Sequence, residues 1–145
     1  MAGDSHFGKV VHVTRAPESA DSIVVCEHAS NRIPEPLKNL GLSRDLQESH
    51  IAWDPGALAV AKGLATRFSA PLVAGGVSRL VYDCNRPPDA AGAILARSEV
   101  YDVPGNRDMS ARDRQERVEH VYVPFRVTLA AELDDRRAFL RLLIA

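Results

Sequence analysis

Short apolar runs and longer helical repeats alternate along the chain, which predicts a domain of mixed strands and helices. Residues 23–26 are apolar and mostly β-branched, the length and type of a strand buried on both faces. Residues 71–74 and 78–82 are further runs of strand length, separated by a pair of glycines that favours a turn. Together with the helices between and after them, these runs predict an α/β sheet.

The first helical signals lie between the first two of these strands. Ser43, with acidic residues in the following turn, predicts a short helix entered through a serine cap. A second helix is predicted over residues 55–68, where Val60, Leu64 and Phe68 recur every four residues and form one apolar face. Asp54 directly precedes this helix. Its carboxylate can serve either as the N-cap of the helix or as a metal ligand.

The longest helical pattern begins at Ser110, which with Asp113 forms a capping box. It continues to residue 133, and Pro124 interrupts it. A proline inside a helix costs about 3 kcal/mol or more, so we expect a kink or two helices. Residues 87–109 have little periodicity and predict a long loop. The apolar face of the long pattern consists of Val118, Val121, Phe125, Leu129 and Leu133.

The size and net charge of the chain favour a function that acts on a small-molecule substrate. The 145 residues suit a single domain with a real core, preceded by a polar lead-in over residues 1–21 in which Val10, Val11 and Val13 offer an edge strand. Lys and Arg number 18 against 19 Asp and Glu, without a basic stripe, so we expect no nucleic-acid partner and no membrane partner. No signal peptide or bilayer-length apolar segment is evident, and the two cysteines suit buried free thiols, so we expect a cytoplasmic protein.

Candidate chemistry gathers where the first predicted strand ends. Glu27 and His28 follow it directly, and ligands in open α/β sheets bind beyond the carboxyl ends of strands. The structural alternative is a solvated Glu27 and a His28 that bonds a nearby carbonyl. The same argument applies to the polar residues after the third predicted strand, if the strands are parallel.

A polar set surrounds that later strand end: Arg79, Asp83, Asn85 and Arg86. Arginine binds a carboxylate through two parallel hydrogen bonds, and asparagine adds a neutral donor, so the set could clamp an acidic small molecule. Alternatively, Asp83 pairs with Arg86 or Arg79 and only fixes the loop.

The segments C-E-H-A-S-N-R-I-P, H-I-A-W-D-P-G-A, S-R-L-V-Y-D-C-N-R-P, V-P-G-N and Y-V-P-F occur in this order. In this they resemble the N-formylglutamate amidohydrolase family, over about residues 22–133. The resemblance implies a mixed sheet flanked by helices, as in zinc carboxypeptidases and aspartoacylases. It also implies hydrolysis of N-formyl-L-glutamate to glutamate and formate in histidine degradation.

The same resemblance implies roles for individual residues. His28 would bind Zn²⁺ with Asp54 or Glu27 as the carboxylate partner, and Glu27 would also serve as the catalytic proton carrier. Arg79, Asn85 and Arg86 would hold the carboxylates of the substrate, an N-acyl amino acid. Which carboxylate binds the metal stays open.

The chain departs from the family pattern at its end. Tyr122 to Arg126 lack the two histidines that relatives carry there, and a later family strand with a further histidine has no counterpart. Residues 139–145 are almost entirely apolar, so we expect a truncated family member whose incomplete sheet promotes self-association. The alternatives are an inactive remnant that binds an acidic ligand, and an amidohydrolase of another N-acyl amino acid.

Overall fold

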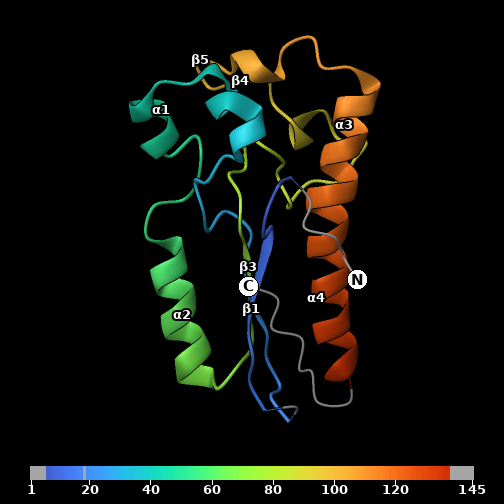
Figure 1. The fold of residues 1–145 in the computed structure, drawn as a ribbon. Coiled ribbons are helices and arrows are strands. Elements are labelled where there is room, and N and C mark those ends of the chain that lie inside the picture. Colours follow the sequence, from blue (N-terminus) through green and yellow to red (C-terminus); the bar gives the residue numbers. More distant parts are fainter. Residues whose placement is uncertain (1–5, 18, 138–145) are drawn as a thin grey trace.

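A computed structural model describes residues 6–17 and 19–137, and its centre is a small mixed sheet. Strands β1 (Val11–Thr14), β2 (Val24–Cys26) and β3 (Leu72–Gly75) lie in the order β1-β3-β2 (Figure 1). β2 runs parallel to β3, and β1 runs antiparallel to it. The predicted α/β class, the first two strands and the edge strand in the lead-in are confirmed. The expected burial of the first strand on both faces is wrong, because β2 lies at an edge of the described sheet and its Val24 and Val25 are only half-buried.

Helices cover both faces of this sheet. α2 (Ala57–Phe68) packs against β2 and β3, and α4 (Val123–Asp135) contacts β1 and β3 from the other side (Figure 1). No helix among the described residues is long and apolar enough to span a bilayer. The apolar stretch 139–145 lies outside the described residues.

Shorter elements form the end of the molecule beyond the carboxyl ends of β2 and β3 (Figure 1). α1 (Arg44–Glu48) begins at Ser43, whose Oγ accepts a hydrogen bond from the N–H of Leu46, so the predicted serine cap is confirmed. The predicted loop 87–109 contains several short elements of its own. The remaining elements here are η1 (Glu35–Gly41), η2 (Ala91–Ala93), β4 (Arg97–Ser98), β5 (Tyr101–Asp102) and η3 (Pro104–Asn106).

The long helical pattern divides before its proline. α3 (Ala111–Arg117) starts with the predicted capping box, in which Ser110 Oγ accepts from the N–H of Asp113. A π-helical turn, η4 (Val118–Tyr122), then leads into α4, and the N–H of Val123 reaches back to the carbonyl of Val118. Pro124 thus sits in the first turn of α4, where its missing N–H is tolerated.

The predicted orientation of α2 is wrong. Val60, Leu64 and Phe68 are 64%, 44% and 54% exposed, whereas Ala61 and Ala65 are buried against the sheet. Both sets recur every four residues, so the spacing defined a stripe without deciding which stripe faces the core. Short alanine side chains let the helix lie close to β2 and β3.

Asp54 does not cap α2. The helix begins after Gly56, which has a left-handed backbone with φ 89°, and no side chain caps it. The carboxylate of Asp54 is bonded to His28 and Arg79 instead.

The predicted third strand, residues 78–82, is also wrong. This segment is a buried turn in which the N–H of Val81 donates to the carbonyl of Ser78. Ser78 Oγ donates to the carbonyl of Ala52 and accepts from the N–H of Leu80. The last three residues of the run are apolar because they lie in the main core, where Leu80, Val81 and Tyr82 are at most 1% exposed.

Candidate functional site

His28 lies in the turn after β2 and is held between two carboxylates. Its Nδ1 is 3.2 Å from Asp54 Oδ2, and its Nε2 is 2.7 Å from Asp83 Oδ1. The side chains of His28 and Asp83 are 15% and 12% exposed, whereas that of Asp54 is 50% exposed. The Nε2 edge of the imidazole is therefore anchored inside the protein, and Nδ1 points toward a solvent-accessible carboxylate.

Backbone hydrogen bonds set the position of Asp54. Its N–H donates to the carbonyl of His28, which ties the segment before α2 to the turn after β2. Arg79 Nη1 then donates to Asp54 Oδ1 at 3.0 Å, and the N–H of Arg79 donates to the carbonyl of Ala52. Arg79 therefore orients the carboxylate that faces His28.

Asp83 follows the buried turn and is fixed from several sides. Its N–H donates to the carbonyl of Ala93, and its Oδ1 accepts from the N–H of Asn85. Its side-chain partner is His28, so the alternative pairing of Asp83 with Arg86 or Arg79 is wrong. The spacing grouped Asp83 with its sequence neighbours, and only the tertiary fold brings it to residue 28.

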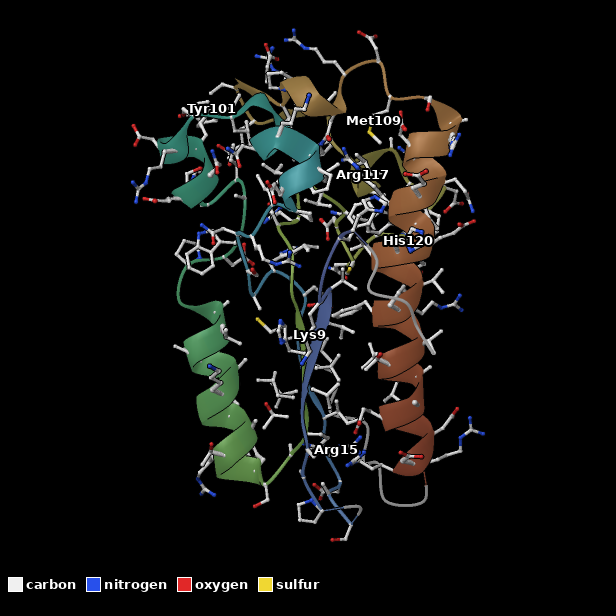
Figure 2. The ribbon with its side chains drawn as sticks, in the orientation of Figure 1. Lys9, Arg15, Tyr101, Met109, Arg117 and His120 are labelled. Carbon is white, nitrogen blue, oxygen red and sulfur yellow. The ribbon has the colours of Figure 1, made fainter. Side chains whose placement is uncertain are left out.

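The turn that precedes Asp83 is itself held by buried polar side chains. Arg117, which projects from the end of α3 (Figure 2), donates from Nη1 to the carbonyl of Val81 and to Asn106 Oδ1. Asn106 Nδ2 donates in turn to the carbonyl of Leu80. Neither Arg117 nor Asn106 was a predicted site residue, because a buried arginine has no local signal that separates it from the exposed arginines of the same helix.

The electrostatics of the pair follow from its burial and hydrogen bonds. The hydrogen bond to Asp83 raises the pKa of His28, against an opposing effect of burial. Burial alone would raise the pKa of Asp83, but the hydrogen bonds from His28 and from the N–H of Asn85 together lower it. Asp83 is thus held as a carboxylate, which fixes the orientation of the imidazole.

Two grooves meet at Glu27. One, of about 370 Å³, contains His28 and Asp54 and runs along α2. The other, of about 330 Å³, contains Asn85 and Arg86 and runs along α4. The predicted candidates Glu27, His28, Asp54, Asn85 and Arg86 therefore lie around one end of the sheet, although only Glu27 and His28 directly follow a strand.

The donor set for a metal is partial. Within residues 6–17 and 19–137, no group of three or more His, Cys, Asp or Glu has a metal-binding arrangement. His28 Nδ1 and Asp54 Oδ2, which are 3.2 Å apart, are suitably spaced for two ligands, because two tetrahedral zinc ligands at about 2.0–2.1 Å from the ion lie about 3.3 Å apart. Asp83 then occupies the place of the carboxylate that commonly orients a ligand histidine from behind. Cys26 and Cys84 are free thiols, as expected, and Cys26 is buried, whereas Cys84 is only half-buried.

Comparisons with known proteins identify a matching family model and a similar solved structure. The family model of N-formylglutamate amidohydrolase matches residues 20–145. The crystal structure of gene product Atu2144 from Agrobacterium tumefaciens superimposes with a TM-score of 0.84 at 47% sequence identity, over 90% of this chain and 52% of that one. The chain thus spans about half the length of that protein. No curated protein matches it.

Proposed function

Because the chain belongs to the N-formylglutamate amidohydrolase family, we propose that its site serves the hydrolysis of N-formyl-L-glutamate to L-glutamate and formate. The family match supports amide hydrolysis in general. The observation that carries the narrower proposal is His28, set between Asp54 and Asp83 where two polar grooves meet. Because the chain spans about half of its structural relative, the activity is proposed for the whole protein.

We infer that the cofactor is zinc and that His28 Nδ1 and Asp54 would hold it. When bound, zinc polarises the amide carbonyl and brings the pKa of a bound water to about 7. Asp83 would keep the proton on His28 Nε2, so that Nδ1 presents a lone pair. A complete catalytic zinc site needs three protein ligands, one more than these two residues supply. The likeness to zinc carboxypeptidases forms part of this proposal.

The chain's own residues would bind the substrate and transfer the proton. Glu27 borders both grooves, so its carboxylate can take a proton from the attacking water and return it to the amine as the C–N bond breaks. Asn85 and Arg86 are exposed in the groove beside Glu27 and would hold a substrate carboxylate. Arg79 is already bonded to Asp54, so it would contribute through its remaining donors.

The test measures metal content and formate release together. Purified protein is titrated with zinc and assayed on N-formyl-L-glutamate and on a series of larger N-acyl glutamates. We expect zinc-dependent formate release and a sharp decline with acyl size. Equal rates across the series would overturn the formyl assignment, and a folded protein that binds neither zinc nor substrate would favour the inactive remnant.

Matched variants separate metal from substrate binding. His28→Ala should abolish stoichiometric zinc binding, whereas His50→Ala, at an exposed histidine paired with Glu99, should retain it. Arg86→Ala should leave zinc bound and weaken glutamate binding by about 1.5–3 kcal/mol, the range for a charged hydrogen bond. Arg112→Ala, on the exposed face of α3, is its control. Zinc retained by His28→Ala would refute the metal assignment.

A further inference from the structure

A cavity of about 280 Å³ lies between η1, η3 and α3, at the end of the molecule beyond the sheet (Figure 1). It shares no lining residue with the two grooves that meet at Glu27. Its volume is near the lower end of the range for sites that enclose small molecules, about 300–1,000 Å³. The cavity is therefore large enough for a ligand of a few heavy atoms.

A buried guanidinium supplies the cavity with a positive charge. Arg117 is 4% exposed, and its Nη1 is bonded to the carbonyl of Val81 and to Asn106 Oδ1. Its Nε and Nη2 have no acceptor among residues 6–17 and 19–137, yet neither atom is sealed from solvent, so this edge faces the cavity that Arg117 lines. The Nε and Nη2 edge of an arginine presents two parallel N–H groups, the geometry that binds a carboxylate.

The charge of Arg117 has no ion-pair partner in the described part of the chain. Burial lowers the pKa of Arg117 to about 10, and the nearby Asp113 opposes this shift. The guanidinium therefore stays protonated at neutral pH. Because a buried charge without a partner is unfavourable, the open edge of Arg117 favours an anionic group in the cavity.

Carboxylates line the same cavity near this guanidinium. Asp113 lies one turn before Arg117 on α3, and Ser110 Oγ donates to its Oδ2 at 2.7 Å. Asp113 Oδ1 has no donor among the residues that the structure describes, and Glu116 is a second acid on the cavity wall. These acids would repel a ligand that carries only negative charge. A ligand with an ammonium beside its carboxylate would instead interact favourably with both Arg117 and Asp113.

The rest of the inner wall is apolar. Leu37, Leu40 and Met109 line the cavity, and Met109 lies at the same end of the molecule as Arg117 (Figure 2). The wall is closely packed, because a Cβ on Gly105 of η3 would lie 2.7 Å from the Cα of Leu40. Residues 38–40 have left-handed backbones, with φ 48°, 55° and 55°. Such strain in residues other than glycine is concentrated at functional sites.

We propose that this cavity binds a free α-amino acid with an apolar side chain. Its carboxylate would bind the Nε and Nη2 edge of Arg117, its ammonium would face Asp113, and its side chain would lie against Leu40 and Met109. Nη1 of Arg117 would keep its bonds to Val81 and Asn106. The proposal uses no residue of the candidate hydrolytic site, so it stands or falls independently of zinc and of turnover.

The test is a titration of the full 145-residue chain with L-leucine, followed by NMR at the Nε–H group of Arg117. We expect saturable binding that shifts this resonance and leaves the ring resonances of His28 unchanged. Three analogues each lack one feature of the ligand: L-leucinamide the carboxylate, 4-methylpentanoate the ammonium, and L-asparagine the apolar side chain. The first two should bind at least about tenfold more weakly, because each loses a charged hydrogen bond. L-Asparagine, which has a similar shape, should also bind more weakly.

A matched pair of variants tests the role of Asp113. Asp113→Asn keeps an acceptor for Ser110 and removes the charge, so it should weaken L-leucine binding at least about tenfold and leave 4-methylpentanoate binding unchanged. Asp45→Asn, at an acid in the first turn of α1 and outside the cavity, is the control.

Three results would overturn the proposal: no saturable binding of L-leucine, a shift at His28 in place of Arg117, or equal affinity for L-leucine and any one of its analogues. All three are measured on the unmodified chain, so they decide the question even if a variant fails to fold.

Discussion

Asn106 holds several parts of the fold together through one buried side chain. It is 6% exposed, and its Nδ2 donates to the carbonyls of Leu80 and Leu95, both at 2.8 Å. Its Oδ1 accepts from Arg117 Nη1 at 2.6 Å. One amide therefore joins the turn before Asp83, the loop after η2 and the end of α3.

Asn106→Ala removes these three hydrogen bonds and leaves partners on Leu80 and Arg117 that are buried and one on Leu95 that is half-buried. An unsatisfied buried group costs about 1–3 kcal/mol, and more when it is charged, as Arg117 is. Three such groups would cost at most about 9 kcal/mol together, but Leu95 is half-buried and Arg117 keeps its bond to the carbonyl of Val81, so the loss should be about 3–6 kcal/mol in the free energy of unfolding. Since a domain is stable by about 5–15 kcal/mol in total, the variant should be close to unfolding.

Urea denaturation followed by circular dichroism measures this loss in the free energy of unfolding. The variant Asn31→Ala serves as the reference. Asn31 makes one comparable bond, from Nδ2 to the carbonyl of Gln47 at 2.9 Å, so its loss should be about 1 kcal/mol. The midpoint should fall in both variants at an unchanged slope. If Asn106→Ala destabilises no more than Asn31→Ala, the buried network does not hold this part of the fold together.

Further variants test the sheet, a thiol and a buried ion pair. In Gly75→Ala, the new Cβ would overlap the carbonyl of Glu27, so the variant should lose about 1–3 kcal/mol in urea denaturation, and an unchanged midpoint would contradict this. Burial, then the nearby carboxylates, raises the pKa of Cys84 to about 12, so iodoacetamide should not label it at pH 8 until urea is added; labelling of the native thiol at the rate of a free cysteine would refute this. Because the folded-state pKa is raised, the stability from this thiol is complete below pH 9.0 and is lost as the pH rises toward about 12. Arg136→Met leaves Glu132 buried without its partner at 2.6 Å and should cost about 3–5 kcal/mol; a loss below 1 kcal/mol would argue against a buried pair.

Local signals predicted the elements whose causes are local. The β-branched run before Glu27, the cap at Ser43 and the capping box at Ser110 depend on residues within a few positions of one another, and the structure contains all of them. The sheet class followed from the same runs. These features need no knowledge of the packing.

Tertiary packing decided the predictions that failed. Residues 78–82 read as a strand because they are apolar, but they are buried as a turn in the main core. The stripe Val60, Leu64 and Phe68 read as a core face, but the alanines beside it face the sheet. In both cases the sequence pattern identified the apolar residues correctly. It does not contain the information about which part of the protein these residues pack against.

The candidate site depends both on local sequence signals and on tertiary packing. The position of His28 follows from the end of β2, but its pairing with Asp83 depends on a turn that no strand supports. That turn is held by the buried amide of Asn106 and the guanidinium of Arg117, through the carbonyls of Leu80 and Val81. A carboxylate that fixes an imidazole can be no more rigid than the backbone that carries it. Substitutions at Asn106 should therefore loosen the hydrogen bond between Asp83 and His28 before they unfold the sheet, which is centred on β3.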